Sequence, residues 1–456
     1  MPDFTRIEMG QSPPSTTYNM NGNGLPFFQG KAEFGSLYPE VRKHCSEPNR
    51  IAEPGATLLS VRAPVGPTNL ARERCCIGRG LAAIHPLDQI PEKFVLWLLR
   101  SREPEISEQG TGSTFSAINR KFLHNLSIPL PPLAEQKRIV SRIEELFSEL
   151  DAGEAALKKA RHQLGVYRQA LLKQAFEGKL TAPWRAQNPD LLESPDQLLT
   201  RIQSERQAEF EKQLKKWGAS VEEWESNGEI GKKPSKPRAT NESDPIGQKE
   251  LQPLAELPNG WTYARLSESI VNIDAGKSFS CDERPPAANE IGVAKVSAVT
   301  WGEYDEAESK TCRDAAKIVP EYFINPGDFL LSRANTIELV GAVVIVKRTT
   351  KNVMLSDKTL RINFAGIEPH FILQYLRCRT GRLEIMSRSS GNQESMRNIG
   401  QDRVGAIITP LCPLPEQQEI VRLLDEQFEV IDQNEREIDA ALKRSEALRQ
   451  SILRKA

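Results

Sequence analysis

The chain contains two copies of one sequence unit. Residues 129–140 (PLPPLAEQKRIV) recur as residues 410–421 (PLCPLPEQQEIV), and every position is displaced by 281. Each copy opens a long helical pattern and closes one half of the chain. The duplication predicts two similar globular domains, each followed by a helix, rather than one continuous core. Such a protein can bind a target that itself has two separated halves, and DNA is the obvious candidate.

Three further pairs of segments extend the repeat. They are residues 50–60 and 322–332, 94–100 and 371–377, and 110–118 and 391–399. The four pairs occur in the same order in both halves, so we interpret the match as a duplication rather than a chance resemblance. The separation between partners varies from 272 to 281 positions, which means that the loops between the matched segments differ in length.

Each globular half is predicted to mix strands and short helices. β-Branched residues bounded by Gly and Pro predict strands, and short apolar runs with helical spacing predict helices. The predicted strands are residues 57–61 and 340–346, with an extended last strand at 126–130 and at 406–410. The predicted short helices are residues 94–100 and 371–377. Each half is therefore expected to be one α+β domain of roughly 130–150 residues.

A long helix is predicted after each proline-rich segment. Proline is tolerated in the first turn of a helix, and Glu135 and Glu416 then lie where the helix dipole favours an acidic side chain. Apolar residues recur every seven positions over roughly 40 residues in both copies, which is the spacing of a coiled coil. The residues predicted to pair the helices are Ile143, Leu150, Leu157, Leu164, Leu171, Leu424, Ile431, Ile438 and Ile452.

The periodicity leaves two arrangements of these helices open. Each helix can pack on its own globular domain, or the two helices can pair with each other. A periodicity that runs the whole length of both copies favours the pair, and a pseudo-twofold axis makes the pair antiparallel. The predicted fold class is α+β: two tandem α+β domains joined by two long helices that form an antiparallel coiled coil, with a pseudo-twofold internal repeat.

The predicted domain boundaries follow the repeat and the local composition. A charged helical stretch and a polar, proline-rich segment separate the two halves and predict a flexible, solvent-exposed linker. The five predicted regions are a first globular domain (1–129), a central coiled-coil helix (130–180), a charged helix with linker (181–256), a second globular domain (257–409) and a C-terminal coiled-coil helix (410–456).

Composition and charge argue against several classes of protein. A net charge of −1 argues against a protein that grips DNA alone, because phosphate neutralisation needs a basic surface. No apolar run reaches the roughly 18–20 residues of a membrane helix, and the first residues lack the pattern of a signal peptide. A cytoplasmic protein is expected. The seven cysteines and five histidines have no metal-ligand spacing, so no metal site is expected.

The chain shows no sequence motif of a catalytic site. Gly276, Lys277 and Ser278 resemble the end of a phosphate-binding loop, but Val271 stands where the earlier glycine is required. No His-Glu-x-x-His or Gly-x-Ser-x-Gly pattern occurs, and no tetrapeptide typical of amine-directed methyltransferases occurs. No catalytic residue and no bound cofactor are therefore expected. Two alternatives stay open: an enzyme with unrecognised motifs, and a coiled-coil scaffold with two protein-binding domains.

Two groups of segments match one known family. The first group comprises residues 10–14, 24–30, 59–67 and 77–81, and the second comprises residues 129–140, 175–180 and 257–261. On these residues the chain resembles the DNA specificity subunits of type I restriction-modification systems. The first group resembles their target recognition domains, and the second resembles their repeated framework. The Leu-Pro-x-Gly-Trp opening at 257–261 has no counterpart before Gly10, so the first target recognition domain is expected to be N-terminally shortened.

The resemblance implies a set of roles and partners. Each target recognition domain would read one half of a bipartite target in double-stranded DNA. The helices would set the spacing between the half-sites and dock two methyltransferase subunits, which carry S-adenosylmethionine and methylate adenine. Motor-nuclease subunits, which use ATP and Mg, would join for cleavage. These cofactors are expected on the partner subunits and not on this chain.

Base readout needs polar or cationic side chains on loops beside a groove of the DNA. Such residues stand near predicted strand ends and in two glycine-bounded loops at matching repeat positions, 109–116 and 387–397. For each of them, an ordinary exposed polar side chain is the alternative. The predicted DNA-binding residues are Gln29, Lys31, Arg62, Arg79, Ser113, Thr114, Lys277, Lys295, Arg333, Asn335, Arg388, Asn392 and Gln393.

Overall fold

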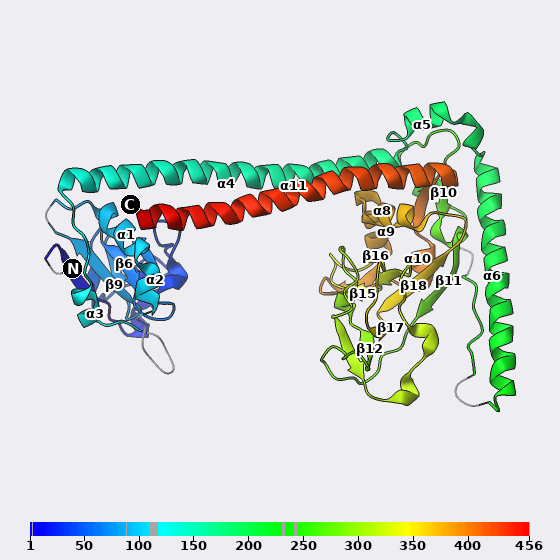
Figure 1. Cartoon of the computed structure of the whole chain (residues 1–456), viewed down its shortest axis with the longest axis horizontal. Coiled ribbons are helices and arrows are strands. Elements are labelled where there is room, and N and C mark those ends of the chain that lie inside the picture. Colours follow the sequence, from blue (N-terminus) through cyan, green and yellow to red (C-terminus); the bar gives the residue numbers. More distant parts are fainter. Residues whose placement is uncertain (2, 88, 109–116, 230–232, 241–243, 456) are drawn as a thin grey trace. The chain divides into compact units, whose positions relative to one another are not determined.

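The computed structural model describes residues 1, 3–87, 89–108, 117–229, 233–240 and 244–455. The chain divides into two compact units, Met1–Arg161 with Glu435–Ala456 and His162–Asn434 (Figure 1). We call them unit 1 and unit 2 and describe each by itself. None of the described helices is both long and apolar enough to cross a membrane.

Unit 1 contains two small sheets and the helices that cover them. Its elements are β1 (Thr5–Met9), β2 (Tyr18–Asn19), β3 (Leu25–Phe28), β4 (His44–Cys45), β5 (Ile51–Ala52), β6 (Thr57–Ser60), β7 (Thr68–Leu70), β8 (Cys75–Ile77), β9 (Leu81–Pro86), α1 (Glu92–Ser101), α2 (Glu103–Glu108) and α3 (Arg120–Asn125). The sheet orders are β1-β9-β6-β7 and β2-β4-β3-β8-β5. Helix α1 packs on the first sheet, where Val95 and Leu99 are buried with Leu59 and Ile84.

Unit 2 contains four small sheets and a larger set of helices. Its strands are β10 (Thr262–Arg265), β11 (Ile270–Ala275), β12 (Ile291–Ala294), β13 (Ser309–Cys312), β14 (Phe329–Ser332), β15 (Ala334–Asn335), β16 (Val343–Ile345), β17 (Asn352–Met354), β18 (Thr359–Phe364), β19 (Ser390–Gln393), β20 (Met396–Asn398) and β21 (Ile408–Leu411). Its shorter helices are α5 (Ala182–Gln187), α7 (Gln248–Leu251), α8 (Pro369–Arg377), α9 (Arg379–Arg388) and α10 (Gln401–Gly405), and the long α6 spans Pro195–Ser226. The sheet orders are β11-β18-β14-β16, β13-β12-β17, β15-β20-β19 and β10-β21.

The duplication inferred from the sequence is visible in the sheets. The order β1-β9-β6-β7 in unit 1 corresponds to β11-β18-β14-β16 in unit 2, and every pair in both sheets is antiparallel. The strands predicted at 57–61 and 340–346 form as β6 and β16. The short helices predicted at 94–100 and 371–377 form as α1 and α8. Local periodicity was sufficient for these elements because each packs on the core of its own half.

The expected last strand is right in unit 2 and wrong in unit 1. In unit 2 the strand is β21, which pairs antiparallel with β10. Residues 126–130 of unit 1 are not in a strand. The physical reason is the missing partner, because the described part of unit 1 offers no strand equivalent to β10. An extended segment without a neighbouring strand has no ladder of hydrogen bonds to define it.

The charged stretch between the halves is the helix α6, whose Leu198 and Ile202 are buried in the core of unit 2. The described residues after α6 run back against it. The indole Nε1 of Trp217 donates a hydrogen bond to the carbonyl oxygen of Pro234 at 3.0 Å. Lys233 and Lys236 lie over the rings of Trp224 and Trp217. Part of the segment expected to be a free tether therefore packs on α6, and its residues 230–232 and 241–243 lie outside the described residues.

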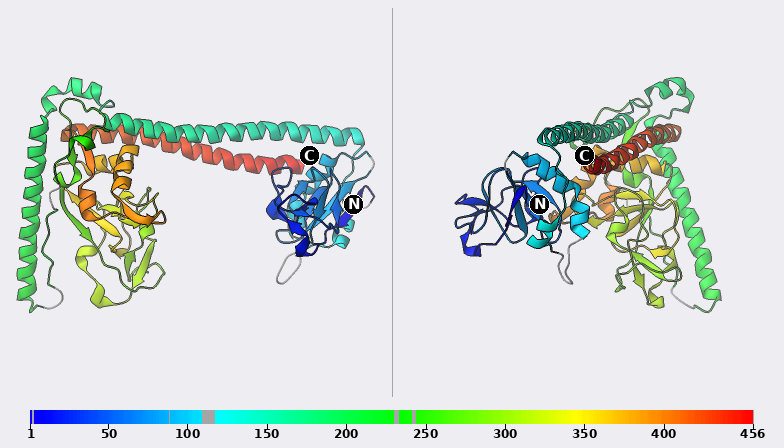
Figure 2. Two further views of the ribbon diagram at one scale, coloured as in Figure 1. Left: turned by 180° about the vertical axis from the view of Figure 1, so that it is seen from behind. Right: turned by 60° about the vertical axis from the view of Figure 1, so that its left-hand side comes forward.

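The two long helices are α4 (Leu133–Phe176) and α11 (Leu414–Lys455), which lie side by side in both views of Figure 2. Each begins within the proline-rich segment, and Glu135 and Glu416 lie in the first turns, as the sequence predicts. The helices pack together as a coiled coil. The alternative in which each helix packs only on its own globular domain is therefore excluded.

The contacts between α4 and α11 run in opposite chain directions. In unit 1, Asp151 forms an ion pair with Arg449, and Arg161 forms one with Asp439 at 2.9 Å. In unit 2, Arg168 forms an ion pair with Asp432. Residue numbers that rise on α4 and fall on α11 define an antiparallel pair. Exposed ion pairs of this kind contribute little stability, about 0–1 kcal/mol each, so the apolar seam carries the association.

The apolar seam follows the seven-residue spacing. The positions that are buried are Ile143, Leu171, Leu424, Ile431 and Ile438, and those that are half-buried are Leu150, Leu157, Leu164 and Ile452. Near the end of α11, Leu453 is more deeply buried than Ile452. The seam therefore shifts by one position there.

Replacing Ile431 by Ala is expected to destabilise unit 2 by about 2–5 kcal/mol, because the lost side chain leaves a cavity in a packed core. Ile431 is 2% exposed. The neighbouring Val430 is 57% exposed, so Val430→Ala provides a matched control and is expected to change stability by less than about 0.5 kcal/mol. Hydrogen exchange of α11 amides in the two variants tests the difference. Equal losses of stability in the two variants would contradict the burial of Ile431 in the apolar seam.

Candidate nucleic-acid interface

Four polar side chains of unit 1 converge on one small hollow. Gln29, Lys31, Arg62 and Arg79 line a cavity of about 210 Å³, together with backbone and side-chain atoms of Gly30, Ser60, Ala63 and Gly80. These four are all the predicted DNA-binding residues of unit 1 that the structure describes. Ser113 and Thr114 lie outside the described residues.

The hollow is built at the ends of strands. Gln29 follows β3, Arg62 follows β6, and Arg79 lies in the turn between β8 and β9. Lys31 opens a short 3-10 turn, Lys31–Glu33. Each residue is thus on a loop held by a rigid strand, which is where binding residues gather on a scaffold.

Glycines allow the loops to approach this closely. A Cβ atom at Gly80 would lie 2.2 Å from the carbonyl oxygen of Gln29, and one at Gly10 would lie 2.1 Å from the carbonyl oxygen of Gly78. Real side chains do not tolerate such distances, so a larger residue at either position would push the loops apart. Gly10 and Gly80 therefore have a packing role.

The hollow is lined by three cationic side chains. Lys31, Arg62 and Arg79 are exposed, and none of them has an ion-pair partner among the residues that the structure describes. The nearby Glu33 carboxylate is occupied in part by the backbone N–H of Gly30, at 3.1 Å. Arg and Lys in such a position can donate hydrogen bonds to phosphate oxygens or to the O6 and N7 atoms of guanine.

In unit 2, two predicted residues meet at one loop. The backbone N–H of Gly276, beside Lys277, bonds to the carbonyl oxygen of Ser356 at 3.2 Å, and the N–H of Arg333 bonds to the carbonyl oxygen of Lys358 at 2.9 Å. Lys277 is exposed, and Arg333 is half-buried. The loop between β17 and β18 thus joins Lys277 and Arg333 in one region.

Sequence reasoning missed Lys358 in this loop. Lys358 forms an ion pair with Asp357 at 2.8 Å, and Ser278 donates a hydrogen bond to the same carboxylate at 2.6 Å. Burial by itself would raise the pKa of Asp357, but the bonds from Lys358 and Ser278 lower it overall. The repeat could have indicated the loop, because it corresponds to the turn between β8 and β9 that carries Arg79.

A small sheet presents the second predicted loop of unit 2. Strands β19 and β20 form a hairpin, and β15 pairs with β20 so that Asn335 lies opposite Arg397. Gln393 is exposed on this hairpin, whereas the side chain of Asn392 lies outside the described residues. The Oδ1 atom of Asn335 accepts a hydrogen bond from the N–H of Thr336 at 2.9 Å. Asn335 and Gln393 therefore share one sheet.

Lys295 and Arg388 are used inside unit 2. Lys295 donates a hydrogen bond to the carbonyl oxygen of Glu283 at 3.2 Å. Arg388 is only 15% exposed, donates to the carbonyl oxygen of Ala406 at 3.0 Å, and pairs with Glu384 at 2.7 Å. Both side chains stabilise their own surroundings, so we leave them out of the proposed interface.

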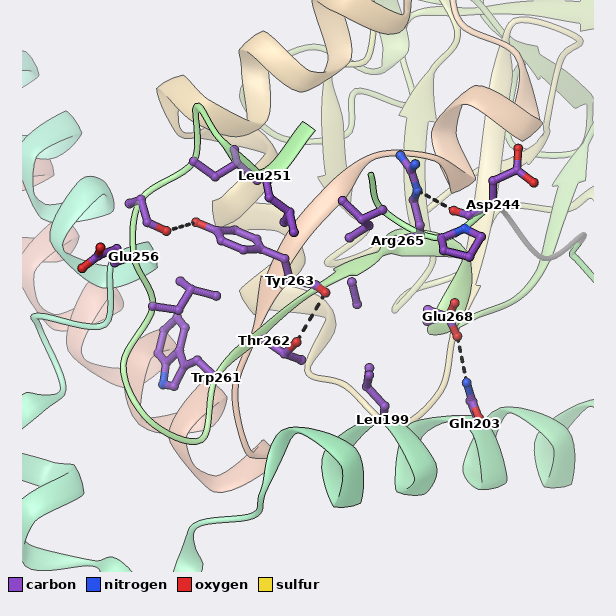
Figure 3. A pocket seen from close by; sticks show the side chains of 16 residues that line it. Leu199, Gln203, Asp244, Leu251, Glu256, Trp261, Thr262, Tyr263, Arg265 and Glu268 are labelled. Carbon is purple, nitrogen blue, oxygen red and sulfur yellow. Dashed lines mark hydrogen bonds between the residues drawn. The ribbon is translucent and has the colours of Figure 1, made fainter. Parts of the chain in front are cut away.

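A larger hollow of unit 2, about 620 Å³, lies between α6, residues 244–257 and β10 (Figure 3). Several of its polar groups are bonded within the chain. Tyr263 donates to the carbonyl oxygen of Ala255 at 2.8 Å, and Arg265 donates to that of Asp244 at 3.0 Å (Figure 3). The described residues contain no group of three His, Cys, Asp or Glu side chains placed to hold a metal ion.

Comparison with known proteins gives consistent matches. A family model described as the type I restriction modification DNA specificity domain matches residues 2–159. The putative type I restriction enzyme MjaX specificity subunit of Methanocaldococcus jannaschii is 39% identical over 178 residues, which cover 39% of this chain and 41% of that protein. The type I restriction enzyme EcoDI specificity subunit of Escherichia coli is 26% identical over 460 residues, which cover 100% of this chain and 88% of that protein.

Residues 2–159 match the type I restriction modification DNA specificity domain, and the whole chain is similar to type I restriction enzyme specificity subunits. A solved structure, the HsdS subunit from Thermoanaerobacter tengcongensis, is 51% identical over 34% of this chain and 38% of that chain, with a TM-score of 0.31. The matches to the MjaX and T. tengcongensis subunits span less than half the length of each of those proteins.

Proposed function

We propose that the chain is a non-catalytic, sequence-specific DNA-binding subunit of a type I restriction-modification complex. Each globular domain reads one half of a bipartite target in double-stranded DNA. The paired helices set the spacing between the half-sites and dock two methyltransferase subunits. Motor-nuclease subunits complete the complex for cleavage, and S-adenosylmethionine, ATP and Mg are bound by the partner subunits. The chain acts in the cytoplasm.

The convergence of Gln29, Lys31, Arg62 and Arg79 on one hollow carries the proposal. Three exposed cations without ion-pair partners in the described structure are free to donate to an anion or to an electron-rich base edge. Donors of these types, on loops at strand ends, are the groups that contact bases and phosphates in DNA grooves. Similarity to type I restriction enzyme specificity subunits supports the same reading.

The near-neutral net charge explains why the proposal includes partners. With a net charge of −1, the chain has little excess positive charge to neutralise phosphates over a long duplex. A DNA-binding protein with small basic patches can obtain sequence specificity from its own loops and DNA affinity from its partner subunits. We therefore expect weak DNA binding by the isolated chain and tight binding by the assembled methyltransferase.

Adenine methylation mapping tests the function directly. Cells that contain the partner methyltransferase subunits are compared with and without this chain. The expected result is methylation at one bipartite motif that depends on the chain. Methylation that is independent of the chain would contradict the proposal. Methyltransferase or nuclease activity of the purified chain, measured without partner subunits, would show that the chain is itself an enzyme.

Insertion of one helical turn into both long helices tests the spacer role. Four extra residues in α4 between Leu150 and Arg161, and four at the facing part of α11, lengthen the coiled coil by about 6 Å. At about 3.4 Å per base pair, the preferred spacing should grow by about one or two base pairs. Methylation mapping that finds the original spacing in a folded variant would exclude the helices as the spacer.

A further inference from the structure

Two cysteines of unit 2 lie opposite each other on neighbouring extended segments. Strand β13 ends at Cys312, and the segment before β12 runs antiparallel to it. Asp282 and Thr311 exchange both backbone hydrogen bonds, each at 3.0 Å. The residues next to such a hydrogen-bonded pair also face each other, with Cα atoms about 4.5 Å apart and side chains on one face. Those residues are Cys281 and Cys312.

The surrounding packing keeps the two thiols together. Both belong to one apolar cluster, in which Cys312 is buried and Cys281 is half-buried. Arg313 forms an ion pair with Asp282 at 2.5 Å, so the residues that follow the two cysteines are joined as well. Burial raises the pKa of Cys281, and its contact with the Cys312 thiol raises that pKa further. Both thiols are free, and a disulfide needs Cα atoms about 4.4–6.8 Å apart, which this backbone already supplies.

The other half of the chain has a related pair that solvent does not reach. Cys45 on β4 holds the position of Cys312, because each pairs with the first residue of the neighbouring strand, β3 or β12. On its other side Cys45 faces Tyr18, whereas Cys312 faces Cys281. Cys45 shares an apolar cluster with Cys76, but both are 0% exposed. Of these two pairs, the one in unit 2 has the thiol that an oxidant in solution can reach.

We infer that Cys281 and Cys312 form a redox-sensitive dithiol, which hydrogen peroxide converts to a disulfide. The Cys281 sulfur attacks one peroxide oxygen, the O–O bond breaks, and the released hydroxide leaves as water with the Cys281 proton. The sulfenic acid that remains is then attacked by the Cys312 sulfur. The S–O bond breaks, and its oxygen leaves as a second water with the Cys312 proton. The two thiols supply the two electrons that reduce the peroxide.

The disulfide fixes the segment that carries Lys277. One end of this segment is attached by Ser278, which donates a hydrogen bond to Asp357 at 2.6 Å. The other end is attached to β13 by the backbone bonds of Asp282. Oxidation makes the second attachment covalent, so Lys277 has fewer conformations with which to adjust to a ligand. Oxidation therefore lowers the affinity of the assembled complex for DNA, a step that rests on the proposed function.

Peptide mapping tests the disulfide. The full chain is treated with hydrogen peroxide, denatured, alkylated with iodoacetamide and digested with trypsin. Trypsin places Cys281 in peptide 278–295 and Cys312 in peptide 311–313. We expect these peptides to be joined and to separate on reduction, while both thiols of the buried pair in unit 1 are alkylated. Absence of the joined peptides, a different pairing of Cys281, or a disulfide between two chains overturns the inference.

Variants distinguish the disulfide from general oxidation. Cys281→Ser is expected to abolish the joined peptides, and Cys312→Ala gives the same test if the first variant does not fold. Cys45→Ala removes a thiol of unit 1 and should leave the joined peptides unchanged. Hydrogen exchange at residues 276–283 should slow when the wild-type chain is oxidised and should not change in Cys281→Ser. Unchanged exchange in a chain with the mapped disulfide overturns the attachment of the Lys277 segment.

DNA binding tests the consequence of oxidation. The chain is oxidised first and then assembled with reduced methyltransferase subunits. The oxidised wild-type complex is expected to bind a duplex with the mapped motif several-fold more weakly than the reduced complex, and Cys281→Ser should bind equally after either treatment. Equal binding by the two wild-type complexes overturns the regulatory step. If the reduced complex binds no mapped duplex, the proposed function fails, whereas peptide mapping and hydrogen exchange still decide the disulfide.

Discussion

Replacing Glu416 by Ala is expected to lower the free energy of unfolding of unit 2 by about 3–5 kcal/mol, because it leaves a buried guanidinium without its counterion. The Glu416 side chain is 0% exposed and that of Arg185 is 13% exposed. The same substitution removes the acceptor for the N–H of Trp261 and the hydroxyl of Thr181. One carboxylate at the start of α11 thus bonds to the segment after α4 and to Trp261, the residue before β10.

The repeat offers a matched control for this prediction. Glu135 occupies the same place in the other copy but is exposed and unpaired in the described structure. Glu135→Ala is therefore expected to change stability by less than about 0.5 kcal/mol. Hydrogen exchange of amides in β10 and β21 reports on unit 2 alone, which is necessary because a protein of two units need not unfold in one step.

A double-mutant cycle separates the ion pair from the rest of the cluster. If Arg185 and Glu416 act as a pair, the double variant Arg185→Ala with Glu416→Ala should be less destabilised than the two single effects together. Additive effects would show that the carboxylate acts mainly through Trp261 and Thr181. Equal stability of Glu416→Ala and Glu135→Ala would contradict the role of burial.

Replacing both Arg62 and Arg79 by Ala is expected to weaken DNA binding by the assembled complex by about 2–6 kcal/mol. Each lost contact to a base or phosphate costs about 1–3 kcal/mol, and the two side chains line the same hollow. Both are exposed, so the substitutions should leave the fold intact. Binding is measured by fluorescence anisotropy of a duplex that contains the mapped motif, at fixed salt.

A cation elsewhere in unit 1 serves as the control for charge. Arg74 is exposed and forms an ion pair with Glu53 at 3.3 Å. Arg74→Ala removes the same formal charge as either single variant but leaves the hollow unchanged, so binding should change little. If the double variant binds DNA normally, the hollow is not the contact surface. If Arg74→Ala weakens binding equally, the effect is one of net charge.

The salt dependence distinguishes two roles of the arginines. Loss of a phosphate contact reduces the slope of log affinity against log salt by about one for each contact. Loss of a base contact instead relaxes the sequence preference at one position of the half-site. Measuring the single variants on the cognate duplex and on single-base variants assigns each arginine to one role.

Much of the architecture can be predicted from the internal repeat and the spacing of apolar residues in the sequence. The duplicated segments predict two related halves, and the sheet orders of the two units agree with that prediction. The seven-residue spacing of Leu150, Leu157 and Leu164 predicts a paired helix, and Asp151 and Arg161 find their partners on the antiparallel neighbour. These features are readable because a heptad and a repeat depend only on positions along the chain.

The local sequence is less informative about which side chains are available to a ligand. Lys295 and Arg388 have the same residue types as Lys277 and Arg62, yet they bond to groups of their own domain, and Arg388 lies in the last turn of α9 rather than on the predicted loop. Lys358 was missed because its loop becomes part of the surface only through the backbone contact with Arg333. Availability depends on what folds against a residue from a distant segment.

The sequence alone did not predict that the last strand and the glutamate after it differ between the two copies. The segments 126–130 and 406–410 occupy matching positions of the repeat, as do Glu135 and Glu416. The sequence therefore predicts a last strand and an acidic residue in the first helical turn for both copies. Folding makes one segment a strand and leaves the other without a strand partner in the described structure, and it buries one carboxylate and leaves the other in solvent. The physical reason is that Trp261, Thr181 and Arg185 lie far along the chain and reach Glu416 only in three dimensions.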